Sequence, residues 1–384
     1  MEVINGTRYS LLATEAADRE GQPHLLVIAK ATYRLPQRDG GTLTLREVAR
    51  EILLTDVFEG EPGYSSPLIE ADLAFRKPAC DVVFKGSAHA PGGAPVTELP
   101  VVLKLGPIQK TLRVVGARTW KRGLMGISAS APESFTSMPL NWARTFGGMH
   151  EAENENDDRR MCSANPVGCG YASAGIGKNL RDTLAPSIEW PNQPIKKPGE
   201  RYRPAGFGPI GRSWTPRLAL AGTYDEQWKE QVFPRLPADF DEAFFQCAPV
   251  DQRMPYPTGG EPVTLINLTP GGGALRFALP RRLDLSMAAI TRDRAIAKLS
   301  PVVDTVLIDS DEGALDIVWR ASAPLKRSIL EIETLGVGNV CRRWWTSRVY
   351  GTDDCGCGGQ ETDDEDLAPV AQALDAAPAE AVTA

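Results

Sequence analysis

The chain has 384 residues, of which 24% are charged and 42% hydrophobic, and its formal net charge is -7. This length predicts one large domain or two moderate ones, with a core large enough to need no disulfide or metal. The longest apolar runs span only a few residues, far short of the roughly 20 that cross a bilayer, so we expect no membrane insertion.

The acidic excess is concentrated at the C-terminus. Residues 353–384 hold nine of the 49 acidic residues and no basic one, which leaves 40 acidic against 42 basic residues upstream. Nucleic-acid binding needs a concentrated basic face, so a nearly neutral body predicts no nucleic-acid partner. Residues 352–384, rich in Ala, Pro and acids, are predicted to be a disordered tail, either solubilising or a docking segment for a basic surface.

Cysteine and histidine usage gives little support for catalysis. The seven cysteines are scattered, and the first residues show no basic-then-apolar leader, which favours reduced thiols and a cytoplasmic location. Cys355 and Cys357 lack the further ligands of a metal site, and a His150–Cys162 pair depends on a fold that brings the two together. His89 is interpreted as an exposed strand residue. We therefore predict no catalytic residue, no metal and no cofactor.

Residues 1–140 are predicted to form an N-terminal β-rich domain, because period-two alternation dominates them. Residues 25–35 read as a half-buried strand with Lys30 and Thr32 on the polar face, and residues 80–89 read as another strand. Residues 101–105 and 110–120 flank the sequence GPIQ, which is typical of a hairpin loop. The predicted fold class is mainly β, with sandwich or barrel-like units, long irregular loops and a few short helices.

Residues 141–351 are predicted to be a loop-rich segment followed by a second β-rich unit. Residues 150–160 form a charged loop, and prolines exclude a regular helix from residues 187–206. Two hairpins are expected, from 261–268 with 274–280 and from 302–309 with 314–321. Short helices are expected over 224–232 and within 237–247, the second capped by Asp239. A basic and aromatic cluster either packs back on the body, which we favour because Trp is usually buried, or forms a contact patch: Arg342, Arg343, Trp344, Trp345 and Arg348.

Residues 203–253 are dense in glycine, proline and aromatic side chains, which predicts a rigid, folded loop region held by its side chains. Several ordered motifs accompany it: KATYRL (30–35), DVVFKGSAHAPGG (81–93), VVGARTW (114–120), RTFGG (144–148), NPVGCGY (165–171), GTYDEQW (222–228), FPRLPADFD (233–241) and APVDQR (248–253).

With these motifs, residues 1–319 resemble the bacterial family catalogued as domain of unknown function 2169 (DUF2169). The resemblance implies a type VI secretion role, in which an adaptor chaperone holds a secreted effector protein and loads it on the spike protein or its PAAR tip protein. It implies no catalytic residue.

Seven loop residues are candidates for protein binding, because aromatic and arginine anchors on rigid loops often carry interface energy. They are Asn165, Gly168, Phe207, Trp214, Arg217, Tyr224 and Trp228. Any of them that is buried would instead determine the fold. The alternative function is a β-sandwich hydrolase acting on a glycan or lipid, with Asp225 and Asp239 as acid and base converging in a pocket. Capping of turns is the competing role for both carboxylates.

Overall fold

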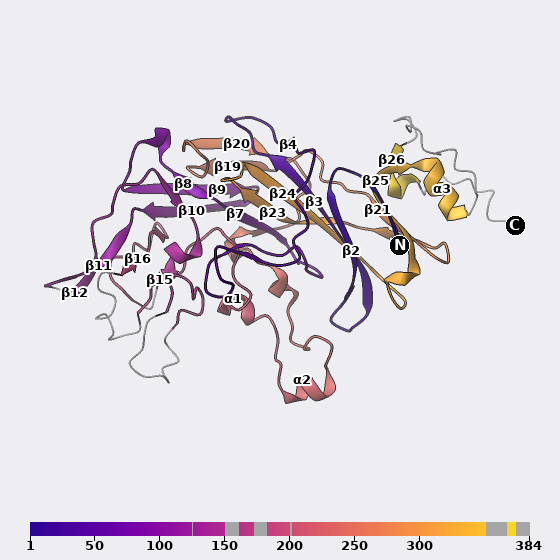
Figure 1. The fold of residues 1–384 in the computed structure, drawn as a ribbon, viewed down its shortest axis with the longest axis horizontal. Helices are drawn as coiled ribbons and strands as arrows, with labels where there is room; N and C mark the ends of the chain where they lie inside the picture. The colour runs from indigo at the N-terminus through magenta and orange to yellow at the C-terminus, as the bar shows by residue number, and fades with distance from the viewer. Residues whose placement is uncertain (125, 150–160, 173–182, 200–201, 351–366, 374–384) are drawn as a thin grey trace.

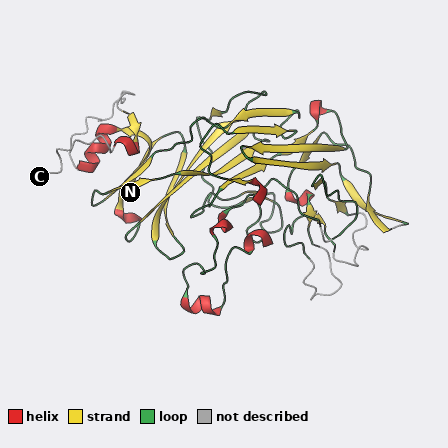
Figure 2. Cartoon of the chain, turned by 180° about the vertical axis from the view of Figure 1, so that it is seen from behind, coloured by secondary structure: helices red, strands yellow, loops and turns green. Residues whose placement is uncertain are grey.

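The computed structural model describes residues 1–384 except 125, 150–160, 173–182, 200–201, 351–366 and 374–384 (Figure 1). Strands dominate the described residues, and the helices are few and short (Figure 2), which confirms the mainly β prediction. The predicted loop over 150–160, with His150, and the Cys355–Cys357 pair lie outside the described residues. No helix among the residues described has the length and apolar character to cross a membrane.

The main sheet is built around a long central strand, β3 (Pro23–Arg34). Adjacent strands of this sheet are antiparallel, except that β7 and β23 run parallel. The order is β18 (Arg253–Met254), β7 (Cys80–Lys85), β23 (Val302–Asp309), β24 (Ala314–Pro324), β3 and β2 (Ser10–Ala17), with β4 (Thr44–Leu45) beside β3.

The prediction that residues 25–35 form a half-buried strand is wrong about the burial. Both faces of β3 are covered, and Lys30 and Thr32 are only 3% and 0% exposed. The Lys30 Nζ donates to the Glu51 carbonyl (3.0 Å) and to the Asp72 carboxylate. The segment between β4 and β7 therefore covers the polar face and supplies partners for its buried polar groups.

A second sheet packs its apolar face on the main one. Its order is β17 (Ile188–Glu189), β10 (Ile108–Val115), β9 (Glu98–Leu105), β19 (Pro262–Ile266) and β20 (Ala274–Ala278). The three predicted hairpins are confirmed as β9–β10, β19–β20 and β23–β24. The β9–β10 turn is shorter than GPIQ, because Ile108 is buried and pairs with Leu105.

Both large sheets join strands that are distant in sequence. In one, β9 pairs with β19, and in the other β7 pairs with β23. One hydrophobic core contains Val27 of β3, Leu103 of β9 and Leu265 of β19. Strands from residues 1–140 and from residues 141–351 thus share two sheets and one core, across the predicted boundary at residue 140.

Smaller elements extend from these layers. They are β5 (Val57–Phe58) with β6 (Pro67–Ile69), β8 (Ser87–His89) with β13 (Ser137–Pro139), β11 (Arg118–Gly123) with β12 (Gly126–Ala129) and β16 (Leu184–Ala185), β14 (Phe146–Gly147) with β15 (Cys169–Gly170), and the helices α1 (Thr215–Leu218) and α2 (Glu226–Gln231).

A third sheet carries the C-terminal elements. Its order is β1 (Glu2–Gly6), β25 (Ile332–Cys341), β21 (Met287–Thr291) and β22 (Ile296–Leu299), and β26 (Leu367–Pro369) pairs with β25. Helix α3 (Arg342–Tyr350) places Trp345 fully buried against Ile290 and Val340, which confirms that this part of the predicted cluster packs back on the body.

The predicted disorder of residues 352–384 is wrong for residues 367–373, while the rest of that range lies outside the described residues. Strand β26 and helix α4 (Val370–Ala373) return to the third sheet, where Val370 is 0% exposed. Gly336 makes this possible, because a Cβ there would lie 2.8 Å from the Val370 side chain and 2.9 Å from Trp345. Residues 367–373 have few large apolar side chains, but Ala368 and Val370 pack in a cluster with residues of β21, β25 and α3.

Replacing Val370 with Asp should detach this C-terminal segment, because an unpaired carboxylate cannot remain in that apolar site. We expect amide hydrogen exchange, followed by mass spectrometry, to show residues 367–373 protected in the wild type and exchanging rapidly in Val370→Asp. The matched control is Gln372→Asp, which puts the same charge at an exposed position and should leave the protection intact. Equal exchange in the wild type and Val370→Asp would contradict the docked segment.

Candidate functional site

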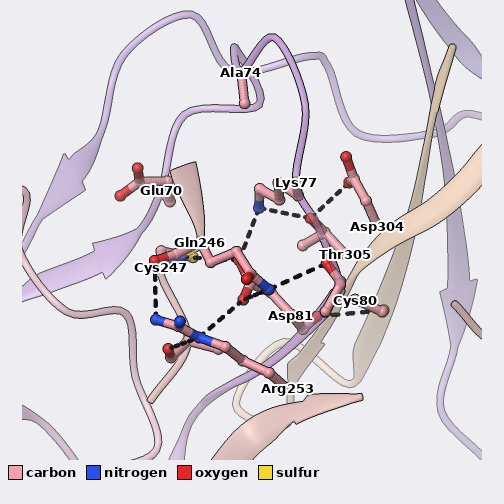
Figure 3. Close-up of polar contacts among 12 residues, drawn as sticks. Glu70, Ala74, Lys77, Cys80, Asp81, Gln246, Cys247, Arg253, Asp304 and Thr305 are labelled. Atoms are coloured by element: carbon pink, nitrogen blue, oxygen red, sulfur yellow. Dashed lines mark hydrogen bonds and ion pairs between the residues drawn. The ribbon is translucent and has the colours of Figure 1, made fainter. Parts of the chain in front are cut away.

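The inserted segment 203–253 is fastened to the main sheet by a buried polar network centred on Asp81 of β7 (Figure 3). The Asp81 carboxylate is 0% exposed and accepts from the Lys77 Nζ (3.0 Å) and from the Cys247 backbone amide (2.9 Å). Lys77 also donates to the Thr305 hydroxyl (2.8 Å). The Arg253 Nε lies 4.0 Å from the same carboxylate and donates to the Ala248 carbonyl. The APVDQR motif is thereby held on β7.

Lys77 and the two buried thiols beside it stay protonated at neutral pH. Although burial by itself would lower it, the neighbouring Asp81 carboxylate keeps the pKa of Lys77 above its ordinary value. Burial raises the pKa of Cys247 and of Cys80, so both thiols stay protonated at neutral pH. Protonated, buried thiols are poor nucleophiles. The network is therefore suited to holding backbone in place.

A second buried ion pair closes the same segment. Arg217 is 0% exposed, and its guanidinium makes two hydrogen bonds to Glu70 (3.0 and 2.9 Å). It also donates to the carbonyls of Ile210 (2.8 Å) and Phe244 (3.0 and 2.8 Å). Because Glu70 precedes β7 and the two carbonyls belong to the insertion, Arg217 joins three separate stretches of chain. Its role is to determine the fold, and it is not accessible for binding.

Four other candidate residues also hold the fold together. The Asn165 Nδ2 lies 2.7 Å from the Thr145 hydroxyl and 3.0 Å from the carbonyls of Trp142 and Phe146, which brings NPVGCGY onto RTFGG. A Cβ on Gly168 would lie 2.4 Å from the Asn165 side chain. Phe207 and Trp214 are 0% and 3% exposed and pack edge-on against Phe84 and Trp142.

The remaining two candidates lie on a projecting segment, which we call the arm (residues 222–239). Figures 1 and 2 show α2 at its end, extended away from the sheets. Trp228 is half-buried between Tyr224 (ring centroids 4.7 Å apart) and Phe233 (5.6 Å), and its Nε1 donates to the Arg235 carbonyl. Tyr224 is 52% and Phe233 is 66% exposed. The structure thus leaves the arm as the accessible part of the predicted surface.

The acidic residues of the arm have local structural roles. Asp225 caps α2, which confirms the predicted short helix, by accepting from the Trp228 amide (2.8 Å). The prediction that Asp239 caps the next helical turn is wrong. Asp241 makes that cap, and Asp239 instead accepts from the Thr223 amide (2.9 Å) and hydroxyl (2.7 Å). The backbone hydrogen bond from Thr223 lowers the pKa of Asp239, whereas a general acid needs a raised one.

A buried lysine was not singled out by the sequence analysis. The Lys110 Nζ, on β10, donates to the Gly206 carbonyl (2.6 Å), the Gln252 amide oxygen (2.8 Å) and Asp251 (3.0 Å). It also lies 5.6 Å from the centre of the Phe207 ring. Burial lowers its pKa to about 8. The available signal was its position in an alternating strand, where Lys110 shares the inward-facing positions with Ile108 and Leu112.

Burial shifts the pKa values of three further histidine and cysteine side chains, those of His89, Cys162 and Cys169. His89 is half-buried in β8, and burial lowers its pKa, which keeps the ring neutral at pH 7. Burial raises the pKa of Cys162 and that of Cys169, the latter to about 12. Within the described ranges, no group of three or more His, Cys, Asp or Glu residues has the geometry to hold a metal ion.

The fold and the site define a mainly β protein that fastens a long irregular insertion with buried ion pairs and presents an aromatic arm. Residues 20–320 match the model of a family described as "Uncharacterized protein conserved in bacteria (DUF2169)", so the chain belongs to the DUF2169 family. No curated protein and no solved structure matches the chain.

Replacing Arg217 with Met should destabilise the protein, because the buried Glu70 carboxylate keeps only Arg212 (2.6 Å) as an ion partner among the described residues and the carbonyls of Ile210 and Phe244 lose their donor. Breaking such a pair costs about 3–5 kcal/mol, and we expect a loss of that size in the free energy of unfolding, measured by urea titration. Lys229→Met, an exposed control on α2, should change it by less than about 0.5 kcal/mol. A loss for Arg217→Met no larger than the control's would show that the pair does not fasten the insertion.

The stability contributed by Lys110 should rise with pH between about 8 and 10.5. Its folded-state pKa of about 8 lies below the ordinary 10.5, so in this window the unfolded chain binds the proton and the folded chain does not. We expect the wild-type free energy of unfolding, relative to that of Lys110→Met at the same pH, to increase by about 2–3 kcal/mol from pH 7 to pH 10. A constant difference across this range would contradict the lowered pKa.

Proposed function

We propose that the protein is a cytoplasmic adaptor that binds a type VI secretion effector and helps load it onto the spike or its PAAR tip, and that it acts without catalysis. Membership of the DUF2169 family and the role that this resemblance implies support the secretion context. The observation that carries the binding role is the arm. Its rings pack on one another, and two of them, Tyr224 and Phe233, are more than half exposed.

The internal architecture supports a scaffold that presents a surface. Asp81 and Lys110 join the insertion to the two large sheets, and Arg217 joins it to Glu70, which lies between β6 and β7. A loop fixed in this way loses little conformational entropy when a partner binds, which increases affinity. Aromatic side chains on such a surface are the usual anchors of protein interfaces.

Affinity purification of the full chain from its native host, with identification of the captured proteins by mass spectrometry, tests this function. We expect the wild type to capture a type VI effector or spike component. The double variant Tyr224→Ala/Phe233→Ala should lose at least about 90% of it, since loss of anchor residues typically costs more than 2 kcal/mol of binding.

The control is Tyr64→Ala, which removes an exposed tyrosine (75%) from the loop between β5 and β6. It should retain the captured protein, and all three proteins should melt within a few degrees of one another. Capture of no secretion component by the wild type would refute the adaptor role.

A further inference from the structure

The arm stands beside an acidic surface, and the two together define what they can bind. An open depression of about 690 Å³ lies at the base of the arm, lined by Asp18, Glu20, Asp239, Asp241 and Glu242. Arg19 is the one basic residue among the described residues that line it, and it pairs with Glu20 (3.2 Å). The Arg76 Nε lies 3.6 Å from Glu242, so two exposed arginines offset only part of the charge of the five carboxylates. The depression shares Asp239 with the arm, so the acidic and the aromatic surfaces are continuous.

The arm is held in a fixed direction relative to this depression. The Asp241 amide donates to the Leu220 carbonyl (3.0 Å), and Thr223 bonds to Asp239, so both ends of the arm are tied together at its base. Gly222 adopts a φ of +83° here, and a Cβ on it would lie 2.9 Å from Pro237. The base of the arm is therefore fixed at both ends, and Tyr224 directly follows Thr223, which contacts the Asp239 carboxylate of the depression.

Hydrogen bonds lower the pKa of two carboxylates of the depression, Asp239 and Asp18. The backbone hydrogen bond from Thr223 lowers the pKa of Asp239. Burial opposes the shift in Asp18, but hydrogen bonds from Gln22 and His24 lower its pKa overall. The surface therefore offers negative charge beside exposed aromatic rings. A complementary partner carries positive charge beside a bulky apolar side chain.

We propose that the arm and the acidic depression together bind a segment of the effector in which lysine or arginine residues stand next to a bulky apolar side chain. This inference rests on the proposed adaptor function, and it names the chemistry of the partner. The apolar side chain packs against Tyr224 and Phe233, and the cations lie over Glu20 and Glu242. Ammonium and guanidinium groups also interact favourably with aromatic faces, so the two parts of the surface cooperate.

The test uses the purified full chain and two fluorescein-labelled synthetic peptides, one of alternating lysine and leucine and one with glutamate in place of lysine. Fluorescence anisotropy at physiological salt should show at least about tenfold tighter binding of the lysine peptide. Tyr224→Ala/Phe233→Ala should weaken its binding about tenfold or more. Glu20→Gln/Glu242→Gln, which leaves the aromatic cluster untouched, should also weaken it, and its residual binding should depend less on salt.

Matched controls separate this surface from the general negative charge of the chain. Tyr64→Ala removes an exposed ring elsewhere, and Glu61→Gln removes an exposed carboxylate elsewhere. Both should bind the lysine peptide as the wild type does. Equal affinity for the two peptides, or the same loss in the controls as in the arm and depression variants, would overturn the proposal. Because the peptides need no host protein, either result is independent of whether the purification from the host recovers a secretion component.

Discussion

The Asp81 carboxylate is the point on which the arrangement of the insertion depends. It is fully buried in the main sheet, and within 4.0 Å it gathers an ammonium group, a backbone amide and a guanidinium group from other stretches of chain. A charge in that position is costly unless each of these partners is in place. The same side chain therefore excludes alternative arrangements of residues 246–253, since any shift would leave a buried charge without its partners.

Buried ion pairs of this kind contribute little net stability compared with apolar packing, because desolvation offsets most of their attraction. Their value here is in specifying one structure. Residues 203–253 contain only short helical turns and the first residue of the two-residue strand β18, so the hydrogen bonds of a regular ladder cannot hold them. Arg217 donates to the carbonyls of Ile210 and Phe244, and Lys110 donates to that of Gly206, so side chains take the place of backbone donors for these carbonyls. An irregular segment becomes a rigid one by this means.

The local features of the fold could be predicted from the sequence, and the long-range ones could not. Alternation and turn residues predicted the β9–β10, β19–β20 and β23–β24 hairpins, because each depends on residues close in the chain. The pairing of β7 with β23 and of β9 with β19 has no local signal. The burial of Lys30 has no local signal either. Its alternation with apolar neighbours is the same whether the polar face of the strand contacts water or the Asp72 carboxylate.

The candidate site shows the same division. Composition predicted a rigid, aromatic-rich loop segment. Aromatic and arginine residues occur both in cores and in contact surfaces, so the sequence alone could not show that Arg217 is buried and Tyr224 exposed. What separates them is the location of their partners. Arg217 bonds to Glu70 and to two carbonyls outside its own helix, whereas Tyr224 packs only within the arm, on Trp228.

The arm's self-contained packing also explains how it can be exposed and ordered at once. Its indole is held by the Arg235 carbonyl and by two neighbouring rings, so its conformation does not depend on burial against the sheets. A segment ordered by the body alone would have to bury its aromatic side chains to stay folded. The conformational entropy of the arm is already lost in the folded protein, because its own contacts order it. The exposed faces of Tyr224 and Phe233 therefore remain available as apolar area for a second molecule.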